Sequence, residues 1–153
     1  NLDEMKNMMK LNPISVKAFM DLESDESLEK IFHDLSILKE HASYNGLVAT
    51  HCEKKSIVES ETERLKQNGE NPAIDYTYAR PTKSEDESVK QAIELARAND
   101  LRLHICHLSS SKSLSIAKSA TNPQINIFSF FIVYSKRLCC KDMKKFIYLC
   151  PFV

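Results

Sequence analysis

The sequence predicts an α/β fold in which helices alternate with the strands of a parallel sheet. Three short runs, 14–20, 47–50 and 101–106, have the apolar composition of buried strands. Stretches with helical spacing of apolar residues separate these runs, and a strand–helix–strand order is typical of βα units on a parallel sheet. The 153 residues, 42% of them hydrophobic, are enough for one modest domain.

The first part of the chain is predicted to form one βα unit. A weak helical pattern over residues 1–12 precedes the strand at 14–20. Apolar residues then repeat at helical spacing as far as His41, and Asp25 or Ser27 is expected to cap this helix.

Two further units follow. A helix is predicted over 53–68 after the second strand, and 73–80 is predicted to be irregular because prolines flank it. Ser84 is predicted to cap the next helix. The strand at 101–106 alternates apolar and polar residues, and the helix predicted over 112–120 follows it.

Composition excludes several functional classes. Lys and Arg together number 21, as do Asp and Glu, so the basic excess of a general nucleic-acid binder is missing. Two glycines are too few for a Walker loop or a dinucleotide fingerprint. We expect no membrane segment, no signal peptide and, since the five cysteines form no CxxC pair, a reducing cytoplasmic setting. Asn1 in place of an initiator Met favours a segment of a longer protein.

Each strand-like run carries or ends in a residue that can bind a metal or act as a base. These residues are Lys17, His51 and His107. A single strand-end histidine is more often hydrogen-bonded to the backbone than catalytic. Such a residue occurs in all three runs, and the carboxyl ends of parallel strands lie at one edge of a sheet. The three residues together therefore favour a binding site over three separate backbone hydrogen bonds.

The last 33 residues differ from the rest. After Ala120, glycine and glutamate are absent, and the only acid is Asp142. The segment 121–153 is compatible with a buried strand and a terminal element, but the composition favours residues outside the gene's proper frame. We therefore divide the chain into a domain at 1–120 and a divergent tail at 121–153.

Four short motifs follow one another along residues 13–120. They are Val16-Lys17-Ala18-Phe19-Met20, His51-Cys52-Glu53, Arg80-Pro81-Thr82-Lys83-Ser84-Glu85 and His104-Ile105-Cys106-His107-Leu108-Ser109-Ser110. In this order the motifs together resemble those of the cyclic amidohydrolases, the group that includes dihydroorotase, allantoinase and hydantoinase (dihydropyrimidinase).

The resemblance implies a partial (β/α)8 barrel of the TIM type with a metal centre at the carboxyl ends of its strands. By resemblance, Lys17 matches a lysine that is carboxylated to bridge two metals, and His51 and His107 match the ligands of the second metal. Arg80 and Glu85 match a recurring structural motif. The implied metal is zinc, which binds imidazole nitrogen and oxygen.

Other metal-capable side chains are expected to have supporting roles. His104 lies further back along its strand than His107, so it is expected to pack near the site. Cys52 and Cys106 are expected to be small buried residues. His33 and His41 are expected on a helix surface.

The departures from the family pattern are equally informative. The family begins its site with a His-x-His pair, and none occurs here. It also uses a late aspartate as general base, and Asp142 stands in an unrelated setting. We therefore predict no catalytic residue, at most one weakly held zinc ion, and no activity for this chain alone. A complete barrel takes about 250 residues.

The resemblance implies hydrolysis of a small cyclic amide. The charged pair Lys54-Lys55 after Glu53 favours dihydroorotase, which converts dihydroorotate reversibly to N-carbamoyl-aspartate in pyrimidine biosynthesis. Allantoinase, hydantoinase and a non-catalytic binding module derived from the barrel remain as alternatives. No nucleic-acid or membrane partner is expected, and a homo-oligomer is left open.

Overall fold

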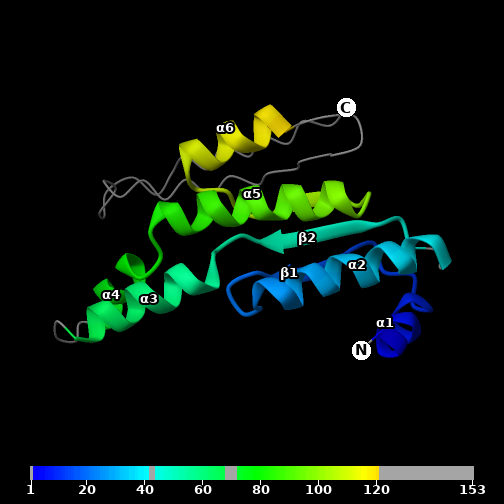
Figure 1. Ribbon diagram of the computed structural model, residues 1–153, viewed down its shortest axis with the longest axis horizontal. Coiled ribbons are helices and arrows are strands. Elements are labelled where there is room, and N and C mark those ends of the chain that lie inside the picture. The colour runs from blue at the N-terminus through cyan, green and yellow to red at the C-terminus, as the bar shows by residue number, and fades with distance from the viewer. Residues whose placement is uncertain (1, 42–43, 68–71, 121–153) are drawn as a thin grey trace, which may run out of the picture.

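The computed structural model describes residues 2–41, 44–67 and 72–120 (Figure 1). The tail predicted at 121–153 lies outside the described residues. The elements in chain order are α1 (Leu2–Met9), β1 (Val16–Phe19), α2 (Asp25–His41), β2 (Leu47–His51), α3 (Lys55–Lys66), α4 (Pro72–Tyr78), α5 (Thr82–Ala98), β3 (Arg102–Ile105) and α6 (Ser111–Ala120).

The three predicted strands form a parallel sheet in the order β1-β2-β3. Phe19 of β1 pairs with His51 of β2, and Thr50 of β2 pairs with Ile105 of β3. Because the strands are parallel, their carboxyl ends lie at one edge of the sheet. The predicted α/β class and parallel strand order are therefore confirmed.

The two faces of the sheet differ in chemistry. One face is buried and apolar, with Val48, Leu103 and Ile105 fully buried. The opposite face carries Lys17 and Phe19, and the side chain of Phe19 is 49% exposed. The predicted alternation of polar and apolar residues along the third strand is confirmed.

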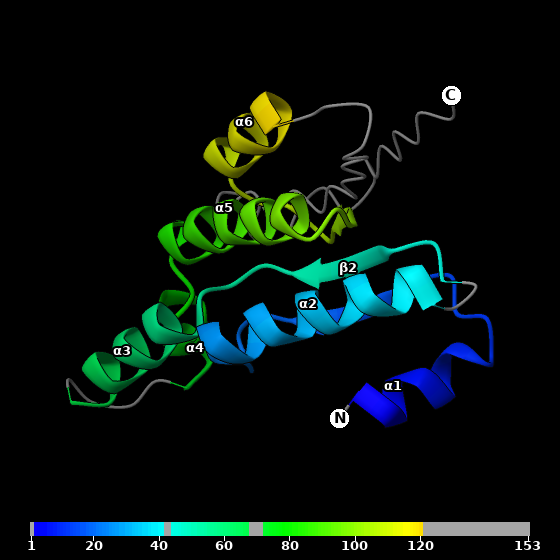
Figure 2. The ribbon, with the colours of Figure 1, turned by 45° about the vertical axis from the view of Figure 1, so that its right-hand side comes forward.

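Helices α2 and α5 supply the apolar residues that pack with the buried face. In the view of Figure 1, α2 and α5 lie on either side of β2. Helix α6 lies beside α5 in both Figure 1 and Figure 2. The core residues from the two helices are Leu28, Phe32, Leu35, Leu38, Val89, Ala92, Ile93 and Ala96. Among the described residues, no helix is long and apolar enough to cross a membrane.

The cap predicted for α2 was wrong. Ser24 precedes the helix, and its Oγ accepts a hydrogen bond from the amide of Ser27 at 3.2 Å. Asp25 instead accepts hydrogen bonds from the side chains of Lys54, at 2.6 Å, and Gln91, at 2.9 Å. The carboxylate of Asp25 thus connects three elements of the fold.

The cap predicted for α5 was also wrong, because the helix begins two residues before Ser84. Pro81 takes the cap position with an extended backbone. Ser84 is buried, and its Oγ accepts a hydrogen bond from the amide of Lys54 at 2.7 Å. A tertiary partner uses the hydroxyl that the sequence offered as a local cap.

The segment 73–80, predicted to be irregular, is largely helical. Helix α4 begins at Pro72, where a proline fits because the first helical N–H needs no intrahelical partner. Asp75 stands in the first turn, where the helix dipole favours an acid. Pro72 therefore begins a helix where the prediction took it as a break.

Candidate metal centre

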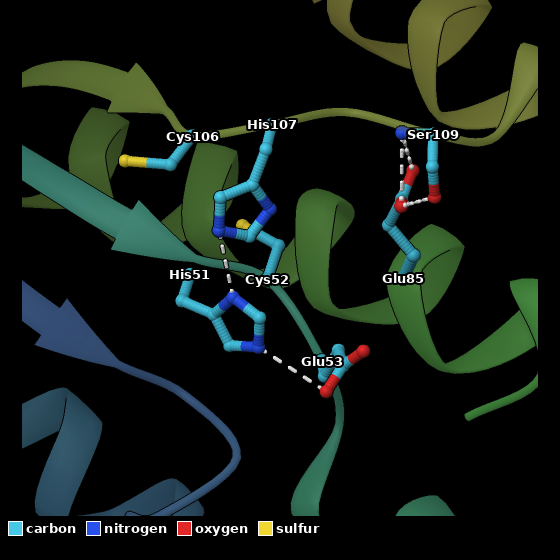
Figure 3. Close-up of a pocket in the computed structure, with 7 residues that line it drawn as sticks. All are labelled: His51, Cys52, Glu53, Glu85, Cys106, His107 and Ser109. Atoms are coloured by element: carbon cyan, nitrogen blue, oxygen red, sulfur yellow. Dashed lines mark hydrogen bonds and ion pairs between the residues drawn. The ribbon is translucent and has the colours of Figure 1, made fainter. Parts of the chain in front are cut away.

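Two of the predicted site histidines contact each other at the carboxyl edge of the sheet. His51 is the last residue of β2, and His107 stands in the segment that follows β3 (Figure 3). Nδ1 of His51 lies 3.0 Å from Nε2 of His107, and the ring centroids are 4.7 Å apart. These residues are 56 positions apart in the sequence, and the parallel pairing of β2 with β3 brings their segments to the same edge.

A carboxylate fixes the outer nitrogen of His51. Oε2 of Glu53 lies 3.1 Å from Nε2 of His51 and 3.0 Å from Nε of Arg80. Burial alone would raise the pKa of Glu53, but the hydrogen bond and charge of His51 and the charge of Arg80 outweigh it, so the pKa is lowered. An ionised carboxylate only accepts hydrogen bonds, so in the neutral form of His51 the proton lies on Nε2 and Nδ1 directs its lone pair at His107.

The surroundings of the second histidine disfavour its charged form. Loss of hydration lowers the pKa of His107, and the nearby charge of His51 lowers it further. A neutral imidazole is the form that binds a metal ion. The backbone of His107 has a φ of 40°, which is the left-handed region that residues other than glycine seldom adopt.

Lys17 lies on the same face of the sheet as His51, according to the strand register, and its side chain reaches the segment that carries His107. Its Nζ is 2.8 Å from Sγ of Cys106, the residue before His107, and 5.3 Å from the ring centroid of Phe19. Burial and the charge of Lys17 lower the pKa of His104. His51 and His107 therefore converge as expected, whereas Lys17 reaches the residue before His107, and the role of all three as metal ligands stays a prediction.

A pocket of about 240 Å³ lies over this edge of the sheet (Figure 3). Its lining residues are His51, Cys52, Glu53, Glu85, Cys106, His107 and Ser109. Cys52 is buried, as predicted, and burial raises the pKa of its thiol to about 12. Cys106 is only partly buried, so its predicted burial is confirmed only in part.

Sequence reasoning missed Asp21 as a neighbour of His51. Oδ1 of Asp21 lies 4.0 Å from Nε2 of His51, and within the described part of the chain it accepts no hydrogen bond although it is buried. Asp21, His51 and Glu53 offer ligand atoms within 4.8 Å of one another. The available signal was position, because Asp21 follows the carboxyl end of β1 closely.

The donor set fits a zinc ion better on the Nδ1 side of His51. Two nitrogens bound to one tetrahedral zinc ion at about 2.05 Å stand roughly 3.3 Å apart, close to the separation of the two histidine nitrogens. Histidines that bind metals commonly donate their other N–H to a carboxylate, as His51 does to Glu53. On the Nε2 side, Glu53 is already engaged by Arg80.

The lysines that favoured dihydroorotase have structural partners. Lys54 donates to Asp25 and Gln91, and Lys55 donates to the carbonyl of Leu22 at 3.0 Å. Neither lysine lines the pocket. This charge pair therefore carries no information about a bound molecule in the described structure.

Comparison with known proteins identifies relatives over most of the chain. No protein-family model matches. The chain is 33% identical to a dihydroorotase of Methanosphaera stadtmanae over 119 residues, which cover 76% of this chain and 26% of that protein. It is 28% identical to an allantoinase of Salmonella paratyphi B over 120 residues, covering 74% and 26%. The chain thus spans about a quarter of the length of these relatives.

The fold has a matching precedent among solved structures. A dihydropyrimidinase from Brevibacillus agri superposes with a TM-score of 0.70 and 23% identity, covering 84% of this chain and 28% of that one. This likeness shows the same fold. The resemblance predicted from the four motifs is confirmed by the sequence relatives.

Proposed function

We propose that this chain, whose relatives are cyclic amidohydrolases, is a segment of such an enzyme and supplies part of its metal centre. One observation carries the proposal most directly. Nδ1 of His51 faces Nε2 of His107 at the carboxyl ends of neighbouring parallel strands, with Glu53 behind the first ring. Neutral imidazoles backed by a carboxylate are typical of zinc ligands.

The sheet itself supports a partial (β/α)8 barrel. Its strands lie side by side in chain order, as in a barrel, and the order does not reverse as it does in a doubly wound sheet. Parallel sheets are normally covered on both faces, yet Phe19 is half exposed on the face that carries Lys17. That face corresponds to a barrel interior whose remaining strands come from outside the described residues.

The site residues divide into ligands and supports. His51 and His107 would hold a zinc ion through the two nitrogens that face each other. A carbamate formed from the Lys17 amine and carbon dioxide would add an anionic oxygen on the same side of the sheet. A bound zinc ion supplies Lewis acidity toward an amide carbonyl and acidifies water at neutral pH. Glu53 keeps His51 in the required tautomer.

The proposed substrate class is a small cyclic amide. Dihydroorotate is preferred over allantoin or a hydantoin because the dihydroorotase relative has the higher identity of the two curated proteins compared, 33% against 28%. The chain alone is expected not to turn this substrate over. The sequence contains no His-x-His pair and no aspartate in the setting of the general base.

Zinc titration of the purified chain tests the proposal. We expect His51→Ala to abolish zinc binding that competes with a chelating dye, because one facing nitrogen is lost. His33→Ala is the matched control, since His33 is exposed on α2 and outside the pocket. Equal zinc affinity in the two variants would contradict the proposed centre.

Dihydroorotate ring opening provides the second half of the test. The chain supplied with zinc and bicarbonate should show no turnover above a reaction without protein. Turnover at an ordinary enzyme rate that His51→Ala abolishes would mean that this chain already contains a complete site.

A further inference from the structure

We propose that Glu85 is a positioning residue that holds His107 against His51. Glu85 stands in the first turn of α5 and lines the same pocket as the two histidines. Its carboxylate accepts hydrogen bonds from the segment that directly follows His107. The proposal concerns the orientation of the ring, and Glu85 itself has no part in chemistry.

The contacts of Glu85 use both of its carboxylate oxygens. Oε1 accepts from the amide of Ser110 at 2.9 Å, and Oε2 accepts from the amide of Ser109 at 3.1 Å. The hydroxyl of Ser109 also donates to Oε2. Charge-assisted bonds of this kind are among the strongest hydrogen bonds that a protein makes. They fix the backbone two and three residues beyond His107.

The backbone of His107 needs such support. Its φ of 40° is unfavourable for a residue with a side chain, and an unfavourable conformation persists only where its surroundings hold it. On one side, the amide of Cys106 donates to the carbonyl of Thr50 at 2.9 Å. On the other side, Leu108 is buried and Glu85 binds the next two amides. The turn is therefore fixed at both ends.

The neighbouring acid has a separate task. Asp86 is buried and accepts from the hydroxyls of Ser110, at 2.7 Å, and Ser113, at 2.8 Å. Oγ of Ser110 in turn accepts from the amide of Ser113 at 3.3 Å, which caps α6. Asp86 thus serves the start of a helix, whereas Glu85 serves the turn that carries His107.

The test variant is Glu85→Gln, which keeps the length of the side chain. We call the hydrogen bonds from Ser109 and Ser110 to Glu85 the clamp. An amide has one oxygen, so its NH2 group would face a backbone donor and at least one hydrogen bond of the clamp would be lost. Glu87→Gln is the matched control, because it removes the same charge from the same helix. Within the described ranges, the side chain of Glu87 pairs with Lys90, at 3.1 Å, and does not line the pocket.

Nuclear Overhauser effects between the ring protons of His51 and His107 form the primary measurement, made without metal. We expect them in the wild-type chain and in Glu87→Gln, and we expect their loss in Glu85→Gln. Retention of these signals in Glu85→Gln would overturn the proposal. If Glu85→Gln does not fold, Glu85→Asp is judged by the same criterion, since it keeps the charge but shortens the reach.

Zinc affinity is the second measurement, and this part rests on the function proposed above. We expect Glu85→Gln to weaken zinc binding by about 10- to 100-fold, the range for lost supports of metal ligands, and Glu87→Gln to leave it unchanged. Zinc binding that is equal in Glu85→Gln and wild type would overturn the clamp alone. If wild type binds no zinc but the ring signals depend on Glu85, the proposed metal function fails and the clamp stands.

Discussion

Glu53 accepts a hydrogen bond from Nε2 of His51 at 3.1 Å, and this contact decides which nitrogen of the ring faces the pocket. Arg80 binds the same oxygen of Glu53 at 3.0 Å, and His51 and Arg80 together lower the pKa of this carboxylate. The lone pair of Nδ1 is then directed at His107. Glu53 and Arg80 therefore set the orientation of the nitrogen that the proposed metal centre would use.

Replacing Glu53 by glutamine is expected to weaken zinc binding by about 10- to 100-fold. An amide can either donate to or accept from Nε2, so it no longer fixes the tautomer of His51. Competition with a chelating dye measures the change. Glu59→Gln on α3 is the control, because Glu59 is exposed. An unchanged zinc affinity in Glu53→Gln would show that the tautomer of His51 is set in another way.

Phe32→Ala is expected to lower the free energy of unfolding by about 3–5 kcal/mol. Phe32 is 0% exposed within the core that α2 contributes, so the substitution leaves a cavity. His33→Ala, at the next and exposed position, should change the free energy by no more than about 0.5 kcal/mol. Urea unfolding of the two variants measures both values. A loss below about 1 kcal/mol for Phe32→Ala would contradict the core described here.

The strands and their order could be predicted from the sequence because they depend on local periodicity. The alternation from Leu101 to Cys106 assigns one face to the core, and the structure buries that face. The two wrong caps show the limit of local signals. Ser84 has the chemistry of a cap, but the amide of Lys54 reaches its hydroxyl from another element. Nothing near Ser84 in the sequence indicates that partner.

The site could be predicted only in part for the same reason. His51 and His107 were found because each follows a recognisable strand. Asp21 was missed because its proximity to His51 depends on the pairing of β1 with β2. The contact of Lys17 with Cys106 joins residues 89 positions apart, and it depends on the strand order, which places one strand between them.

The two described cysteines are expected to differ in reactivity toward a thiol reagent. Cys52 is buried and has a pKa of about 12, whereas Cys106 is partly exposed at the pocket. Alkylation of Cys52 in the folded chain should be slower by about a hundredfold or more, because both access and thiolate are scarce. Peptide mapping by mass spectrometry separates these sites from the other cysteines. Equal alkylation rates at Cys52 and Cys106 that both increase in urea would indicate instead that the fold opens as a whole.

Cadmium-113 bound to the chain labelled with nitrogen-15 at histidine gives the most direct test of the metal centre. Scalar coupling between the metal and a ring nitrogen identifies each ligand atom by residue and position. The account predicts coupling to Nδ1 of His51 and Nε2 of His107, with the Nε2 proton of His51 retained. Coupling to Nε2 of His51, on the side of Asp21 and Glu53, or no coupling to either histidine, would contradict it.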